Sequence, residues 1–204
     1  CTEARAKLLD HYESVLRILD DLAKLLYPKG SSVPADNPEG KMLMRILFAS
    51  CADTFETFMS DLLYQIYLAK PQVLKSEAPV TVKEVLDCAD MQDFITWYAK
   101  EKLQKLQRGS VKGFIADNQA IKPLNVFDKA RIDEIEKILQ IRHLYTHKNG
   151  IVDDKFRRYF PATNINDEYR MTLDEFLKCF EYLAVAVQAV DEEARKVFKL
   201  ALYS

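Results

Sequence analysis

The shortage of glycine is the feature that most constrains the fold of this chain. Only 5 of its 204 residues are glycine, and apolar residues recur at every third or fourth position over long stretches. That spacing matches the 3.6-residue turn of an α-helix and not the two-residue period of a strand. Tight turns between strands also depend on glycine. The sequence therefore predicts an all-α protein.

Two long helices are predicted in the first third of the chain. One covers about residues 2–27, where apolar side chains form a single stripe, and it ends at the segment 28–40, whose prolines and glycines indicate an exposed loop. The next covers about residues 41–69 and is apolar around much of its circumference. A helix of that kind is expected in the middle of a bundle.

Two more long helices are predicted in the C-terminal part. The first starts near residue 128 and ends at the pair Asn149–Gly150, which suits a left-handed C-terminal cap. A connector follows it. Thr172 and Glu175 then form a capping box, and the last helix is expected to run from there to about residue 202.

The middle of the chain, residues 71–127, is less regular and is predicted to be an inserted helical segment. Thr81 and Glu84 form a second capping box ahead of a short helix, and residues 91–108 predict another helix. We expect one domain across residues 1–204, built from four long helices with 71–127 as a helical insertion.

Composition excludes several classes of protein. The formal charge is −2, from 29 basic and 31 acidic residues, so the chain does not coat nucleic acid through bulk charge, and any contact with a polyanion must be local. The four cysteines are scattered and indicate neither a disulfide framework nor a zinc site. No stretch is apolar for long enough to cross a bilayer. We expect a soluble, cytoplasmic protein, and the start at Cys1 suggests a piece of a longer chain.

The segment QIRHLYTHKNG, residues 140–150, places several side chains that can bind anions or transfer protons in the last turns of a predicted helix. It holds two of the chain's three histidines, His143 and His147. On a helical wheel Arg142 lies about 20° from the centre of the apolar stripe, where a charge needs a carboxylate or a ligand anion beside it. The two histidines are one turn apart and share a face. Arg142 and His147 differ by about 140° around the axis, so they meet only if Arg142 stretches or the helix loosens near Gly150.

A local basic patch follows this segment. A phosphodiester there would meet a guanidinium suited to bidentate contact, imidazoles that exchange protons near neutral pH, and flanking positive charges. The predicted RNA contacts are Lys148, Asn149, Lys155, Arg157 and Arg158. The structural alternative is that Arg142 forms an ion pair inside the bundle, with Asp61 or Asp191 as its partner.

Residues 138–153, IxxIRHLYTHKNGIVD, resemble the R-x(4–6)-H signature of HEPN domains, with Arg142 and His147 at the defining positions. The chain is similar to the larger stand-alone HEPN domains of the RiboL-PSP type. The resemblance implies a HEPN-like helical bundle and a metal-independent endoribonuclease without a cofactor, of the kind found in bacterial defence and toxin–antitoxin systems. It also implies a homodimer, which an antitoxin or another defence-system protein often restrains. One position departs from the pattern: His143 stands where active members commonly have Asn or Asp.

RNA can be cut without a metal ion when its own 2′-OH attacks the adjacent phosphorus. We expect His147 to act as general base or acid, and Arg142 to stabilise charge on the phosphate oxygens. His143 is the candidate for the second proton transfer or for orienting RNA. Because acid and base are needed on opposite sides of the phosphorus, two motifs across a two-fold axis are expected to form one cleft. DNA, which lacks the 2′-OH, should not be cut.

Three other interpretations remain open. His143 and His147 could share a metal ion, although the sequence offers neither the Glu of H-E-x-x-H nor an evident third ligand. The chain could be a non-catalytic interaction module that dimerises or docks onto a partner. It could also bind nucleic acid without cleavage through the basic residues of 100–112, next to Trp97 and Tyr98, although such aromatic residues are more often core.

Overall fold

A computed structural model describes residues 1–75, 79–107 and 120–203 of the chain, with only the backbone of residues 104–107. In these ranges the protein is helical, and the β-type pairing is limited to an isolated antiparallel bridge between Ile151 and Glu168. The all-α prediction is confirmed. None of the helices in the described ranges has the length and apolar character that crossing a membrane requires.

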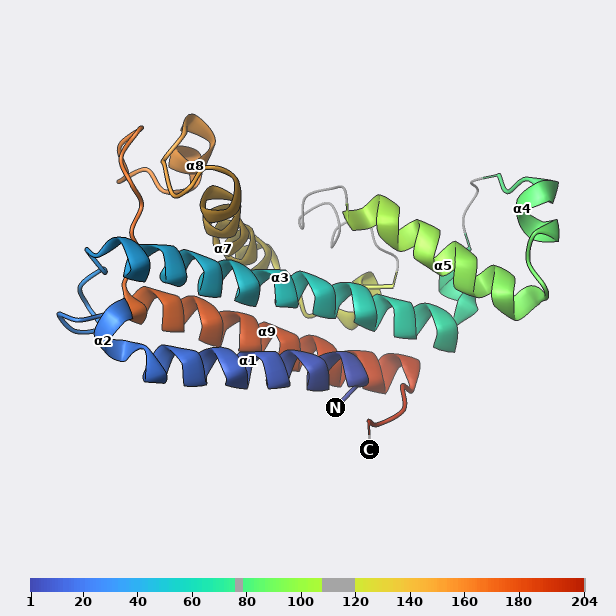
Figure 1. Ribbon diagram of the computed structural model, residues 1–204. Helices are drawn as coiled ribbons and strands as arrows, with labels where there is room; N and C mark the ends of the chain where they lie inside the picture. The colour runs from blue at the N-terminus through green and yellow to red at the C-terminus, as the bar shows by residue number, and fades with distance from the viewer. Residues whose placement is uncertain (76–78, 108–119, 204) are drawn as a thin grey trace.

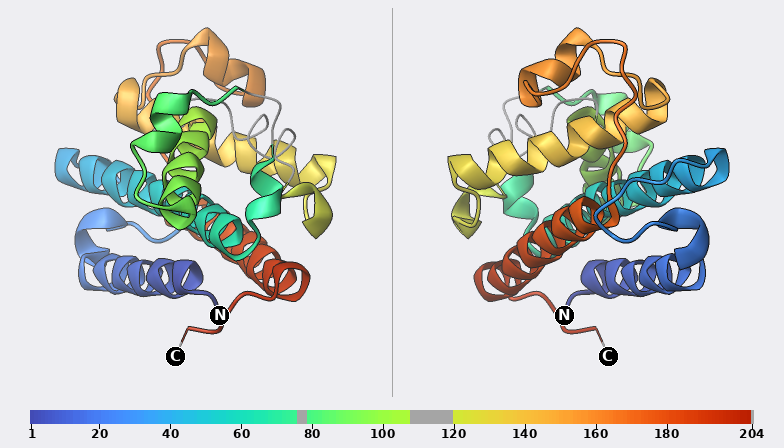
Figure 2. Two further views of the ribbon diagram at one scale, coloured as in Figure 1. Left: turned by 90° about the vertical axis from the view of Figure 1, so that its right-hand side faces the viewer. Right: turned by 90° about the vertical axis from the view of Figure 1, so that its left-hand side faces the viewer.

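The four predicted long helices are present. α1 (Glu3–Asp21), α3 (Pro38–Ala69) and α9 (Leu173–Phe198) run side by side, and α7 (Lys129–His147) crosses α3 at a steep angle (Figures 1 and 2). α3 contacts α1, α7, α9 and the inserted α5. Its central place agrees with its broad apolar surface, and most of its large apolar side chains are buried.

The predicted first helix, residues 2–27, breaks near its end. α1 stops at Asp21, Leu22 leaves helical geometry with φ −101° and ψ 16°, and the short α2 (Ala23–Leu26) follows. Asp20 and Asp21 place two carboxylates at the C-terminal end of α1, where the helix dipole disfavours negative charge, and its last turn holds no basic residue. That unfavourable end explains the break.

The second helix begins earlier than the predicted residue 41. Asn37 caps α3 by accepting the Gly40 N–H at 2.5 Å, and Pro38 occupies the first turn, where its missing N–H costs nothing. A Cβ on Gly40 would lie 2.5 Å from the carbonyl oxygen of Leu25. Glycine is therefore required for the close approach between α2 and the start of α3.

The C-terminal part follows the sequence closely. Asp128 caps α7, and the helix ends in the expected left-handed cap, with φ 51° at Asn149 and φ 82° at Gly150. The connector contains a short helix that was not predicted, α8 (Asp154–Tyr159). The Thr172–Glu175 capping box starts α9, which ends at Phe198 and not near residue 202.

The middle segment consists of η1 (Pro71–Leu74), α4 (Val82–Leu86), α5 (Met91–Gln107) and η2 (Lys122–Leu124). The Thr81–Glu84 capping box that was predicted for its short helix is present. α5 packs against α3, and its buried Ala99 and Leu103 belong to the same apolar core as the long helices. The inserted segment therefore extends the core that α3 organises.

Candidate functional site

Arg142 lies at the crossing of α7 and α3. Its Nε donates a hydrogen bond to Oδ1 of Asp53 at 2.6 Å, and its Nη2 lies 2.5 Å from the same oxygen. Nη2 also lies 3.4 Å from Oε2 of Glu56, and the Arg142 side chain is 27% exposed. The wheel placed this charge toward the bundle, where it needs a partner, and the partners are on α3.

The two partners proposed from the sequence are wrong. Asp191 is fully buried, accepts hydrogen bonds from the backbone and hydroxyl of Thr2, and pairs with Arg5 at 3.6 Å and Arg195 at 3.2 Å. Asp61 lies one helical turn or more beyond the residues of α3 that meet Arg142. The missed signal is the pair Asp53 and Glu56, which are three apart and share a helix face.

A surplus of carboxylates surrounds the single guanidinium. Burial raises the pKa of Glu56, the Arg142 charge opposes that rise, and the nearby charges of Asp53 and Glu136 add to it. Glu136 belongs to α7, is only 8% exposed, and accepts a hydrogen bond from Gln140 at 2.8 Å. Glu56 is therefore the carboxyl in this group that releases its proton less readily than an ordinary glutamic acid.

The two histidines form a pair on the outer side of α7. Their ring centroids are 4.8 Å apart with the rings tilted by 52°. His147 is exposed and His143 is half-buried. Burial lowers the pKa of His143, and the charges of Lys155, His147 and Arg142 lower it further, while Asp153 opposes them. His143 is therefore a neutral imidazole at neutral pH, able to accept a proton.

One copy of the chain does not join Arg142 to His147. α7 is helical through His147, so the two side chains leave the axis about 140° apart, and the backbone departs from the helix only at its cap. Among the described residues, Arg142 forms ion pairs with Asp53 and Glu56, and no hydrogen bond or ion pair links it to His147. The loosening that the sequence allowed occurs after the motif.

The predicted RNA contacts differ in their surroundings. Lys148, Lys155, Arg157 and Arg158 are exposed, and α8, which carries the last three, packs against α7. Lys148 lies 4.0 Å from Asp153, the residue that caps α8. Asn149 is different, because both its backbone oxygen and its side-chain oxygen accept hydrogen bonds from Arg45.

A groove of about 620 Å³ lies between α3 and the C-terminal end of α7. Its apolar floor on α3 includes Met42 and Ile46, which are 59% and 49% exposed. Asp53, which pairs with Arg142, is part of the groove lining on α3, and Asn149 borders the groove at the end of α7. The sequence did not reveal this groove, because a helix apolar on most sides gives no sign of which side its neighbours leave open.

The aromatic residues of the middle segment are packed among themselves. The ring centroid of Phe94 lies 5.8 Å from that of Trp97 and 5.9 Å from that of Tyr98. All three side chains are half-buried. Lys102 lies over the ring of Tyr67 at 5.8 Å. The side chain of Lys105 and residues 108–112, which complete the basic run, lie outside the described residues. The arrangement favours the core interpretation of Trp97 and Tyr98.

Within the described ranges, no group of three or more His, Cys, Asp or Glu side chains is arranged to hold a metal ion, so His143 and His147 have no third ligand there. Comparison of the chain with protein-family models, with curated proteins and with solved structures finds no match.

Proposed function

We propose that the protein is a metal-independent endoribonuclease with a HEPN-like bundle, in which the histidine pair of α7 moves the protons. The observation that carries this proposal is the pair itself, with an exposed imidazole 4.8 Å from a half-buried one whose pKa is lowered. Two neighbouring imidazoles can act as the base and the acid of one reaction, because imidazole exchanges protons near neutral pH. Exposed basic side chains on α8 lie beside them and suit a polyanionic substrate.

In the proposed reaction the 2′-oxygen of a ribose attacks the adjacent phosphorus. The new bond joins the 2′-oxygen to phosphorus, the bond from phosphorus to the 5′-oxygen breaks, and the products are a 2′,3′-cyclic phosphate and a 5′-hydroxyl. His147 removes or donates one of the two protons, and His143 is the candidate for the other. Lys148, Asn149, Lys155, Arg157 and Arg158 are the proposed contacts to the flanking RNA.

Arg142 is the proposed stabiliser of charge on the phosphate oxygens. Its contact with Glu56 is longer, at 3.4 Å, than its contact with Asp53, at 2.5 Å. A phosphate can therefore replace the Glu56 carboxylate while Asp53 keeps the guanidinium in place. Protonation of Glu56, whose pKa is raised, reduces the repulsion that an incoming phosphate meets.

The proposed active form is a homodimer. Because Arg142 and His147 leave one helix about 140° apart, a complete site is proposed to take groups from two copies facing across a two-fold axis. The exposed Met42 and Ile46 in the groove beside Arg142 are the proposed contact surface. Bacterial defence or a toxin–antitoxin pair, with a protein partner that restrains the enzyme, is the setting that the HEPN resemblance implies.

The second candidate is a non-catalytic HEPN-like interaction module, or an RNA-binding protein without cleavage. The observation that favours it is the bonding of Arg142 to Asp53 and Glu56, which is also what a structural ion pair requires. The two candidates differ in what Arg142→Ala does: the module loses its fold, whereas the enzyme keeps its fold and loses activity.

The proposal is tested by incubating the purified protein with total RNA in EDTA and analysing the ends of the fragments. We expect cleavage that EDTA does not suppress, 2′,3′-cyclic phosphate ends, and no cleavage of single-stranded DNA. Absence of cleavage by the dimeric protein, or fragments that carry 5′-phosphates, would exclude the proposed reaction.

A further inference from the structure

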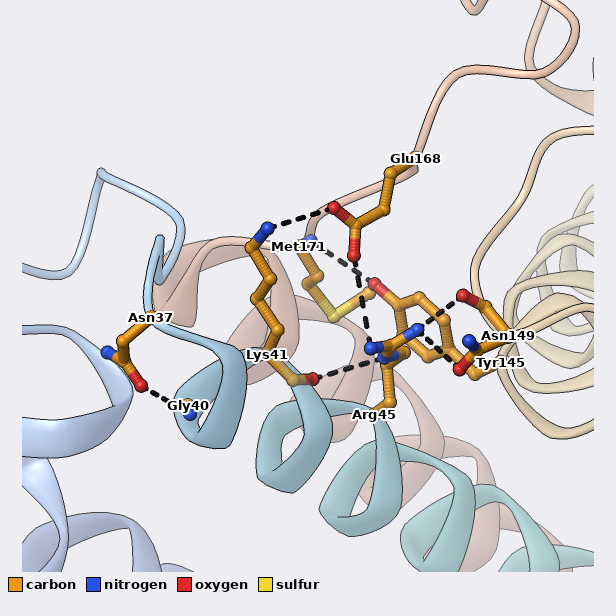
Figure 3. A network of polar contacts seen from close by, with 8 residues as sticks. All are labelled: Asn37, Gly40, Lys41, Arg45, Tyr145, Asn149, Glu168 and Met171. Atoms are coloured by element: carbon orange, nitrogen blue, oxygen red, sulfur yellow. Dashed lines mark hydrogen bonds and ion pairs between the residues drawn. The ribbon is translucent and has the colours of Figure 1, made fainter.

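Arg45 of α3 lies where three parts of the chain meet (Figure 3). Its Nη1 donates hydrogen bonds to the backbone oxygen of Asn149 and, at 2.8 Å, to the side-chain oxygen of the same residue. Its Nη2 lies 3.9 Å from Oε1 of Glu168, and its Nε donates to the carbonyl oxygen of Lys41 at 3.2 Å. The Arg45 side chain is only 18% exposed. Nη1 and Nη2 therefore face two other segments of the chain, while Nε bonds within α3.

The segments that Arg45 holds form a clasp, which we define as residues 149–152 and 166–169. The Tyr169 N–H donates to the Gly150 carbonyl at 2.8 Å, and the Val152 N–H donates to the Asp167 carbonyl at 3.0 Å. Arg45 reaches one limb of the clasp at Asn149 and the other at Glu168. The clasp contains both the cap of α7 and the return of the chain from α8, and Arg45 ties it to α3.

The end of α7 depends on this attachment. The N–H groups of Lys148 and Gly150 both donate to the Leu144 carbonyl, at 3.0 and 3.1 Å, and they close the last turn behind His147. Terminal turns of helices fray because their last carbonyls have no partner within the helix, and their negative dipole end favours a cation. Arg45 supplies that cation and two donors at Asn149. It therefore opposes fraying at the turn that carries His147.

We propose that Arg45 is a positioning residue for His147: through Asn149 it holds the last turn of α7 and thereby fixes the orientation of the imidazole. Its kinetic consequence rests on the proposed ribonuclease function, whereas its effect on the order of α7 does not. Arg45 acts through the backbone and touches neither histidine among the contacts of the described residues.

The test compares Arg45→Met with Lys41→Met. Methionine keeps the length of the Arg45 stem and removes every donor. Lys41 lies one turn earlier on α3 and pairs with the same Glu168, at 3.1 Å, but it does not bond to Asn149, so its variant is a matched control. Arg45→Lys keeps one cation at the site and is the conservative variant.

Two readouts are used, and the first is independent of activity. In Arg45→Met, hydrogen exchange at the Lys148 and Gly150 amides is expected to rise about tenfold or more, with the amides of α9 unchanged, because the last turn opens without the rest of the bundle. The ring resonances of His147, followed by NMR, are expected to move, because the imidazole is no longer held in one orientation. Arg45→Lys should recover part of both effects, and Lys41→Met should show neither.

The second readout is the rate of RNA cleavage. Arg45→Met is expected to lower kcat about tenfold with little change in KM, as a misplaced proton-transfer group does. Unchanged exchange and unchanged His147 ring resonances in folded Arg45→Met would overturn the inference, and so would an equal effect of Lys41→Met. If Arg45→Met does not fold, Asn149→Gly removes one of the two acceptors while keeping the left-handed cap. Unchanged exchange in that variant would also overturn the inference. If the wild type does not cleave RNA, the proposed function fails, and the exchange data still decide the role of Arg45.

Discussion

Arg142 of α7 and Asp53 of α3 form an ion pair in which the guanidinium Nη2 lies 2.5 Å from the carboxylate Oδ1. The pair joins two helices at their crossing, because these residues are far apart in sequence and α7 crosses α3 steeply (Figure 1). Arg142 is thus both a structural contact and the proposed stabiliser of phosphate charge. The two roles can be separated by measuring stability and activity on the same variants.

Arg142→Ala is expected to lower the free energy of unfolding by about 1–2 kcal/mol, because Asp53 and Glu56 lose their counter-charge at a site that solvent still partly screens. The variant should remain folded and should not cleave RNA. Urea denaturation of Arg142→Ala, Asp53→Ala and the double variant measures the coupling between the two residues. A loss large enough to unfold Arg142→Ala at room temperature would favour the non-catalytic module.

His143 should make stability depend on pH. Its pKa in the folded protein is lowered below the ordinary 6.5 by burial and by the positive charges around it. As the pH falls below 6.5, His143 becomes protonated in the unfolded chain while it is still neutral in the folded protein, so the free energy of unfolding decreases. It levels off once the folded protein is protonated too. Subtracting the pH profile of His143→Gln from that of the wild type isolates this contribution, and two parallel profiles would contradict it.

The groove between α3 and α7 is expected to be the dimer contact. Placing a charge on its exposed apolar floor, in Ile46→Glu, should prevent association, because an unpaired carboxylate would be buried at the contact. The matched control is Val185→Glu, a similar change at an exposed apolar residue of α9. Analytical ultracentrifugation should find a dimer in the wild type and the control, and a monomer without cleavage activity in Ile46→Glu. A dimer that Ile46→Glu leaves intact would place the contact elsewhere.

Gly150→Ala is expected to destabilise the protein by about 1–2 kcal/mol, because φ is +82° there and alanine is strained in left-handed geometry. The added Cβ would also lie 3.4 Å from Nη1 of Arg45. Gly30→Ala is the control, because Gly30 has φ +100° and open space around its Cβ position. Chemical denaturation should show the larger loss for Gly150→Ala. Equal losses would mean that contact with Arg45 adds nothing to the backbone strain.

Local signals in the sequence predicted the ends of several elements correctly. The capping boxes at Thr81 and Thr172 and the left-handed cap at Asn149 involve residues within a few positions of each other, so short-range spacing was sufficient to find them. The wheel also gave the direction of Arg142 correctly. Its partner on α3 could not be predicted, because the angle at which α7 crosses α3 depends on packing among all the long helices.

The elements that were missed depend on tertiary contacts. Helix α8 has only 6 residues. Helices of that length are unstable in isolation, so α8 depends on its packing against α7. Arg45 gave no signal in the sequence, because its partners Asn149 and Glu168 come from distant segments. The sequence also could not predict that Met42 is exposed on the open side of α3, because it does not show whether another helix covers an apolar side chain.

The most direct measurement is the rate at which His147→Ala produces 2′,3′-cyclic phosphate ends from RNA in EDTA, compared with the wild type. The control is His11→Ala, which removes the remaining histidine, a residue of α1 that contacts Ser50 at 2.9 Å. We predict a loss of about a hundredfold or more for His147→Ala, the usual effect of removing a general acid or base, and wild-type activity for His11→Ala. Cleavage by folded His147→Ala at the wild-type rate would contradict the assignment of His147 as a catalytic residue.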